Sequence, residues 1–252
     1  MTVIAVLALP PREGLVLPAL SETSPLSSAA ATELYEATLV DTIRAIDRSG
    51  AEPLINYPES DQLPAAHQTD TEPVAELRAV VADALDDSGD VRFEPQVGST
   101  FSARAGNTVT HLLREEDAAS VAVIRGTAPL LSRTMIDEAA MKLRTNEVVL
   151  GPTTEGRVYY AGFTEPIDFA ESFEGIELQR LADRAADADL SIAFLRSSPV
   201  IETGADLRTL LPELRARVSA ERIVPERTAT FVHDHGLGVV DTDDGLELVA
   251  DH

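Results

Sequence analysis

The residues best suited to chemistry in this chain are arginines and small polar residues in loops that follow predicted strands. Arg125 and Thr127 come directly after an apolar run at 120–124, and Arg104 follows a stretch that begins at Gly98. In open α/β sheets, ligands bind beyond the carboxyl ends of the strands. A guanidinium beside small residues, whose backbone N–H groups are accessible, suits an anion. These positions predict an anion-binding cleft, and an ion pair with a surface carboxylate is the alternative for Arg104.

Several familiar catalytic arrangements are absent from the sequence. The chain has no cysteine, which excludes disulfides, thiolate metal sites and cysteine nucleophiles. It also has no phosphate-binding P-loop and no Gly-x-Ser-x-Gly elbow. His233-Asp234-His235 offers two imidazoles and a carboxylate. We interpret this triplet as the end of a surface strand, where alternation sends the two His side chains to one face and Asp to the other.

Strands and helices alternate along most of the chain, and these elements must position the arginines. Short apolar runs predict strands, and apolar residues at helical spacing predict helices. The predicted strands are 3–9, 53–56, 91–94, 120–124, 147–150, 158–163 and 191–195. The predicted helices are 29–48, 71–85, 108–116, 132–143, 177–187 and 206–218, with loops at 10–27 and 57–70. This alternation predicts an α/β fold with a mainly parallel open sheet and helices on both faces.

The last part of the chain follows a different pattern. Three short runs at 229–232, 236–240 and 246–249 predict antiparallel strands, with a turn at Asp244-Gly245. We therefore expect residues 1–218 to form the α/β domain and residues 219–252 to form a small C-terminal β appendage packed on it.

Acidic residues dominate the charge of the chain. It has 43 Asp and Glu against 20 Lys and Arg, a formal net charge of −23, and Lys142 is its single lysine. Such a surface repels itself in dilute buffer, whereas at ~1 M salt the Debye length falls to about 3 Å. This balance predicts a protein of a high-salt cytosol and argues against nucleic acid as a partner. No apolar run approaches the ~20 residues of a membrane span, and the first residues lack the basic region of a signal peptide.

Several segments carry recognisable signatures in a fixed order. The best preserved runs from Val149 to Phe163 and keeps Gly151, Pro152 and Gly156. The matching segments are 9–20, 28–42, 96–104, 121–131, 149–163 and 199–207. Together they resemble a glycosyltransferase-like family of unknown function that shares the GT-A fold of nucleotide-diphospho-sugar transferases. That family is distantly related to the guanylyltransferases of the molybdenum cofactor and of phospholactate, and the resemblance covers residues 3 to about 211.

The resemblance implies a set of anion contacts. The first loop keeps Gly14 but has lost the cations that the family places there, and the one cation left in it, Arg12, stands where the family is apolar. The alternative interpretation is that this loop now only packs. Gln96 and Arg104 match a Gln and an Arg of the family eight residues apart. Arg157 and Tyr159 belong to the segment that, in the family, lies against the acceptor side of the cleft.

The resemblance also implies an acidic pair. Thr127 stands where the family has an Asp at the metal and nucleotide, and Arg125 stands where it has a Gly. Glu155 and Glu202 each replace a family Asp, which keeps a carboxylate but moves it outward by about one methylene. These two are the candidate catalytic acids and the candidate ligands of a Mg²⁺ or Mn²⁺ ion.

Two functions are compatible with these residues. The first is a nucleotidyl- or glycosyl-transferase-like enzyme, with a nucleotide or phosphorylated small molecule in the strand-end cleft. Four arginines would be its anion contacts, namely Arg12, Arg104, Arg125 and Arg157. The alternative is a catalytically inactive relative that serves as a binding or regulatory protein, because the first-loop cations and the strand-end Asp are missing.

Overall fold

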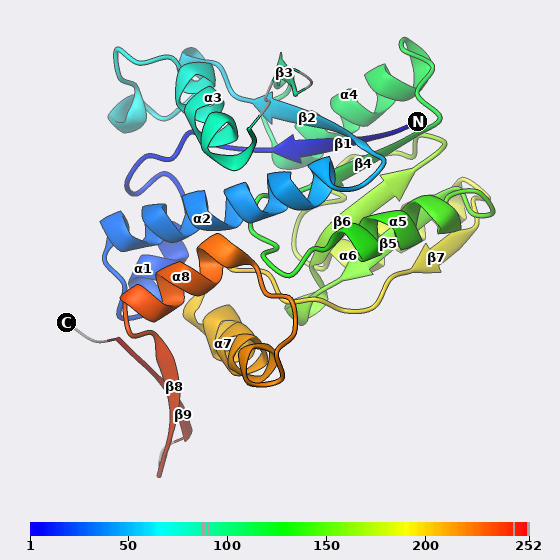
Figure 1. Ribbon diagram of the computed structural model, residues 1–252. Coiled ribbons are helices and arrows are strands. Elements are labelled where there is room, and N and C mark those ends of the chain that lie inside the picture. Colours follow the sequence, from blue (N-terminus) through cyan, green and yellow to red (C-terminus); the bar gives the residue numbers. More distant parts are fainter. Residues whose placement is uncertain (87–88, 90, 244, 251–252) are drawn as a thin grey trace.

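The computed structural model describes residues 1–86, 89, 91–243 and 245–250. A seven-stranded sheet forms its centre, in the order β3-β2-β1-β4-β6-β5-β7 (Figure 1). The strands are β1 (Thr2–Leu7), β2 (Glu52–Tyr57), β3 (Arg92–Pro95), β4 (Ser120–Ile124), β5 (Val148–Pro152), β6 (Val158–Phe163) and β7 (Ile192–Phe194). All neighbours pair in parallel except β6, which is antiparallel to both β4 and β5. The predicted α/β fold with a mainly parallel sheet is confirmed.

Helices cover both faces of the sheet. They are α1 (Pro18–Thr23), α2 (Ser28–Asp47), α3 (Pro73–Ala84), α4 (Phe101–Arg114), α5 (Arg133–Lys142), α6 (Glu177–Asp187), α7 (Gly204–Ser219) and α8 (Glu226–Asp234). Short 3₁₀ turns are η1 (Ser60–Gln62), η2 (Ala65–His67) and η3 (Thr154–Gly156). Within the described residues, no helix is both long and apolar enough to cross a membrane.

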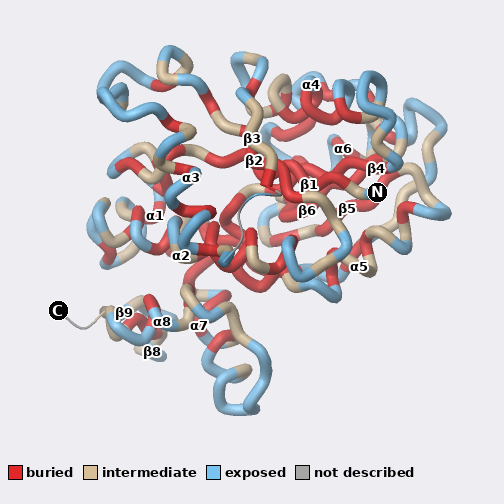
Figure 2. The backbone as a smooth tube through the Cα atoms, turned by 45° about the horizontal axis from the view of Figure 1, so that its top comes forward, coloured by how far each residue is buried: buried red, intermediate tan, exposed pale blue. Residues whose placement is uncertain are grey.

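Strand β1 shows why the sheet is buried on both faces. Its side chains alternate between two hydrophobic cores, so Ile4 and Val6 face one core while Val3 and Ala5 face the other. Helices α2, α3 and α5 contribute to the first core, and α4 and α6 contribute to the second. The buried strands and the exposed outer helix faces are separated clearly in Figure 2. The short apolar runs of the sequence are therefore strands that pack on both sides.

The predicted strand at 229–232 is wrong, because these residues lie in helix α8. Asp41 of α2 caps this helix by accepting from the backbone N–H groups of Arg227, at 3.1 Å, and Thr228, at 2.8 Å. The buried residues of α8 are Thr228, Phe231 and Val232, at helical spacing, and the last two pack on the first core. The surface-strand interpretation of residues 233–235 is also wrong, since they form the last turn and the end of α8.

The final hairpin follows the prediction more closely. Strands β8 (Gly238–Thr242) and β9 (Gly245–Val249) pair in antiparallel fashion beside α7. Asp244 of the predicted turn lies outside the described residues. Two helical segments were also missed: α1 occupies part of the predicted loop, and α4 begins at Phe101. Helix α4 starts there because the Thr100 side chain accepts a hydrogen bond from the Ala103 N–H.

Candidate functional site

A cavity of about 330 Å³ lies at the carboxyl ends of β1 and β4, and we call it the strand-end cavity. Its walls come from the loop after β1, the start of α1, the start of α4 and the loop after β4. The lining residues are Leu7, Leu9, Leu15, Val16, Leu17, Pro18, Ala19, Tyr35, Gln96, Phe101, Arg104, Arg125, Gly126, Thr127 and Glu202. Five of the residues predicted from the sequence are thus brought to one cavity: Gln96, Arg104, Arg125, Thr127 and Glu202.

Arg104 is the cation of this cavity whose terminal nitrogens have no partner among the described residues. It lies in the first turns of α4 and is half-buried, and its Nε donates to the Gly98 carbonyl at 3.1 Å. Across the described residues, its two terminal nitrogens have no hydrogen-bond or ion-pair partner. A guanidinium held at Nε and free at its outer edge can bind a carboxylate or a phosphate through two parallel hydrogen bonds. Arg104 is therefore available to an anionic ligand.

Two further lining residues carry buried polar atoms without a partner. Gln96 donates from Nε2 to the Asn56 carbonyl at 2.7 Å, which leaves its Oε1 unpaired. Flipping this amide would set two acceptors against each other, so the network fixes its orientation. The Thr127 hydroxyl is also buried and unpaired among the described residues. A buried unpaired group costs about 1–3 kcal/mol, so a partner on a bound ligand would remove a real penalty.

Arg125 lines the same cavity but is already neutralised. Its terminal nitrogens bind both oxygens of Glu177, at 2.6 and 3.1 Å, and its guanidinium lies 4.4 Å from the centre of the Phe101 ring. Burial lowers the pKa of Arg125, and the hydrogen bonds and charge of Glu177 raise it by more. Glu177, which is almost fully buried at the start of α6, was missed from the sequence because no local pattern distinguishes it.

Arg157 lies in a cage of carboxylates next to the cavity. It binds Asp206 at 2.5 Å and Glu202 at 2.8 Å, and Glu155 is 3.8 Å away. It also donates to the Thr154 hydroxyl at 3.0 Å. Burial lowers the pKa of Arg157, and the hydrogen bonds and charges of Asp206 and Glu202 raise it above its ordinary value. This guanidinium is therefore saturated by the protein itself.

Asp206 is the second carboxylate that the sequence did not single out. Its side chain is 3 % exposed, and it also accepts from the backbone N–H groups of Thr203 and Glu202, at 2.9 and 3.1 Å. Burial raises the pKa of Asp206, and the hydrogen bonds and charge of Arg157, with those of Thr203, lower it overall. The signal was present in the sequence as the Thr203-x-x-Asp206 capping box at the start of α7.

The two predicted acids have different environments. Glu155 is 71 % exposed, adopts a positive φ of 59° in the η3 turn, and is not part of the strand-end cavity. Glu202 lines the cavity, with one oxygen 2.8 Å from Arg157 and the other 3.8 Å from Arg125. Arg157 lies between them as a common neighbour. Neither carboxylate therefore stands as a free acid facing the cavity.

The other predicted contacts lie away from the cavity. Arg12 binds Glu76 at 2.6 Å and the carbonyls of His67 and Thr71, so it ties its loop to α3. Gly14 has a positive φ of 73° that favours glycine at this turn. Tyr159 is buried and donates to the Arg196 carbonyl at 3.0 Å. Burial raises the pKa of Tyr159, which keeps it a neutral phenol.

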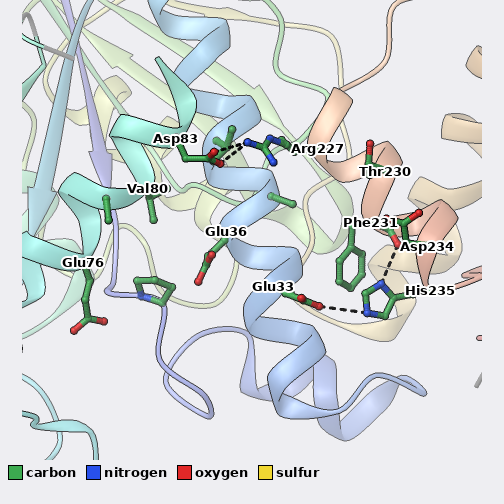
Figure 3. A pocket seen from close by; sticks show the side chains of 14 residues that line it. Glu33, Glu36, Glu76, Val80, Asp83, Arg227, Thr230, Phe231, Asp234 and His235 are labelled. Carbon is green, nitrogen blue, oxygen red and sulfur yellow. Dashed lines mark hydrogen bonds and ion pairs between the residues drawn. The ribbon is translucent and has the colours of Figure 1, made fainter. Parts of the chain in front are cut away.

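A second cavity of about 630 Å³ lies between α2, α3 and α8 (Figure 3). Its wall is acidic, and its basic side chains already have partners: Arg227 binds Asp83 at 2.5 Å, and the His235 ring lies 3.3 Å from Glu33. The pKa of Glu36 is raised by burial and by the surrounding carboxylates. None of the buried unpaired atoms of the described chain belongs to this wall. The strand-end cavity is therefore the candidate site.

Comparisons with known proteins agree with this fold. The model of a family described as an uncharacterized protein conserved in bacteria (DUF2064) matches residues 61–180. A structure from Desulfovibrio desulfuricans G20, provisionally named a nucleotide-diphospho-sugar transferase, superposes with a TM-score of 0.74 at 18% identity, over 93% of this chain and 95% of that one. A cytidylyltransferase from Leptospira borgpetersenii serovar Hardjo-bovis (strain JB197) gives a TM-score of 0.50 at 10% identity, over 93% and 94%.

No curated protein matches the chain in sequence. At these identities the structural likeness shows the fold, which is the one used by nucleotidyl- and sugar-transferases. The fold that the sequence signatures implied is thereby confirmed.

Proposed function

We propose that this chain binds a small anionic molecule in the strand-end cavity and acts as a binding or regulatory relative of nucleotidyl- and sugar-transferases. The observation that carries the proposal is which of the four arginines are already paired with carboxylates of the protein. Arg12, Arg125 and Arg157 are each occupied by carboxylates of the protein, whereas the terminal nitrogens of Arg104 have no partner among the described residues. Arg104 supplies the charge contact, and Gln96 and Thr127 supply the polar contacts.

The carboxylates do not fit a catalytic Mg²⁺ or Mn²⁺ ion. Such hard cations need several oxygen ligands that are free to coordinate. Glu202 and Asp206 direct their oxygens at Arg157 or Arg125, and Glu155 is largely in solvent. In the described part of the chain, no group of three or more acidic or His side chains is placed to hold a metal. The proposed function therefore includes no metal-dependent step.

Nucleotidyl or sugar transfer is the second candidate, and the likeness to the Desulfovibrio desulfuricans structure favours it. For this function, Glu202 would have to leave Arg157 and Arg125 when the substrate binds. The developing charge on a transferred phosphoryl group also needs fixed positive partners. Arg104 alone among the predicted anion contacts offers unpaired terminal nitrogens before such a rearrangement.

A thermal-shift screen tests both functions. The panel contains nucleoside triphosphates, nucleotide-sugars and small phosphorylated or carboxylic acids, each with and without Mg²⁺ or Mn²⁺. Ligand at 100 times its Kd stabilises by about 2.7 kcal/mol, which raises Tm measurably. We expect metal-independent shifts that disappear in Arg104→Gln. Arg114→Gln, at the exposed far end of the same helix, is the matched control.

Two outcomes would contradict this proposal. Metal-dependent stabilisation by one nucleotide would favour the transferase, and Glu202→Gln would then be the next variant. A flat response of the wild type to every anion would refute ligand binding at this cavity.

A further inference from the structure

The chemistry of the strand-end cavity defines a narrower class of ligand. We infer that the ligand is a carboxylic acid with an apolar body and a hydrogen-bond donor, bound as a single negative charge without a divalent cation. This inference rests on the proposed function and specifies the substrate class of the same site.

The charge of the cavity wall sets the charge of the ligand. Arg104 is the lining cation with free terminal nitrogens among the described residues, because Arg125 is bound by Glu177. Glu202 places a carboxylate in the same wall. A monoester phosphate carries about −1.5 to −2 charges at neutral pH, and a nucleotide polyphosphate carries more. One guanidinium matches one carboxylate, and no second lining cation with free terminal nitrogens in the described chain would balance further negative charge.

The wall itself is mainly aliphatic and aromatic. The loop after β1 contributes Leu15, Val16 and Leu17, and the sheet and α4 contribute Leu7 and Phe101. Ligand pockets range from about 300 to 1,000 Å³, so a cavity of about 330 Å³ suits a small molecule. Burying apolar surface against this wall stabilises the complex in proportion to the area removed from water. The body of the ligand is therefore apolar.

The unpaired atoms require a donor on that body. Gln96 Oε1 can only accept a hydrogen bond, since its Nε2 is committed to the Asn56 carbonyl. The Thr127 hydroxyl can donate or accept. Both atoms are closed off from solvent, so their pairing with a ligand requires the side chains around them to move. A hydroxyl or an amide N–H on the ligand would supply what Gln96 lacks.

Titration calorimetry on the full chain, with a fixed set of probes, tests this inference. The probes are octanoate, its ω-hydroxy derivative, octyl phosphate, octanediol as the uncharged analogue, and CTP with and without Mg²⁺. We expect the two acids to bind, the hydroxy acid more tightly, with no effect of Mg²⁺. We expect octanediol to bind at least tenfold more weakly than the hydroxy acid, because a charge-assisted pair is lost.

Two variants in the cavity and one control outside it separate the role of the site from effects on folding. Arg104→Gln should weaken both acids at least tenfold, whereas the exposed Arg114→Gln of the same helix should not. Thr127→Val removes the hydroxyl while keeping the shape, so it should fold normally and reduce the advantage of the hydroxy acid. Both variants are compared with the wild type by their melting temperatures before titration.

The outcomes distinguish this inference from the proposed function. Tighter binding of octyl phosphate than of octanoate would overturn the carboxylate assignment. If CTP binds and this binding is lost in Arg104→Gln, while neither acid binds detectably, the inference is overturned and the proposed function stands. If no probe binds in a way that depends on Arg104, both fail.

Discussion

Replacing Arg157 by Met should destabilise the protein through the buried carboxylate that it leaves behind. The Asp206 side chain is 3 % exposed and that of Arg157 is 12 % exposed, and they meet at 2.5 Å. Breaking a buried ion pair by removing one partner costs about 3–5 kcal/mol. Asp206 would keep its hydrogen bonds from Thr203 and Glu202, so we expect the lower end, about 3 kcal/mol. For a domain of this size, that is a fall in Tm of about 6–12 °C.

The pH dependence follows from the pKa of Asp206, which lies below its ordinary value in the wild type. A depressed folded-state pKa contributes stability that is present above the unfolded-state pKa and is lost as the pH falls through the folded-state pKa. In Arg157→Met, burial acts without the guanidinium, so the pKa of Asp206 should rise. The stability gap between the two proteins should therefore be largest at neutral pH and shrink toward acid pH.

Chemical denaturation measures this effect in the wild type, Arg157→Met, Asp206→Asn and the double variant, with one control variant beside them. Asp206→Asn in the Arg157→Met background removes the unpaired charge and should restore part of the loss. Arg114→Met breaks an exposed ion pair as a control and should cost at most about 1 kcal/mol. The reasoning is refuted if Arg157→Met is as stable as that control, or if the second substitution rescues nothing.

Three other predictions concern stability. Thr127→Val should leave stability unchanged or raise it by up to about 1 kcal/mol in urea denaturation, since the buried hydroxyl has no partner in the described chain; a clear loss would reveal one. Glu36→Gln should stabilise by about a few tenths of a kcal/mol at neutral pH, a small effect because solvent screens this exposed group. Burial and, after it, repulsion from neighbouring carboxylates raise the pKa of Glu36 by disfavouring its ionised form, so the gain should vanish as falling pH protonates it, and a gain that persists would contradict this origin. The wild-type Tm should rise between about 0.1 M and about 2 M KCl, because salt screens the net charge of −23; a falling Tm would refute this reading of the composition.

The sequence by itself determined the class of the fold and most of its elements. Strand β4 was predicted with its observed bounds, because an apolar run of that length between polar segments has few alternatives to a buried strand. The helix at 132–143 was predicted closely for a similar local reason, the Ser132 cap that binds the Met135 N–H. These signals lie within a few residues of one another, so a short stretch of sequence is enough to predict the element.

Only the tertiary structure decided which charged residues are free to bind a ligand. Arg12 meets Glu76 over 64 residues, Arg125 meets Glu177 over 52, and Arg157 meets Asp206 over 49. Helix α8 depends on Asp41, which caps it from more than 180 residues away, and a local pattern of short apolar runs therefore suggested a strand. The desolvation and side-chain entropy costs of an ion pair or a helix cap do not depend on how far apart its partners are in the sequence. The packing of the sheet and helices therefore decides which side chains meet.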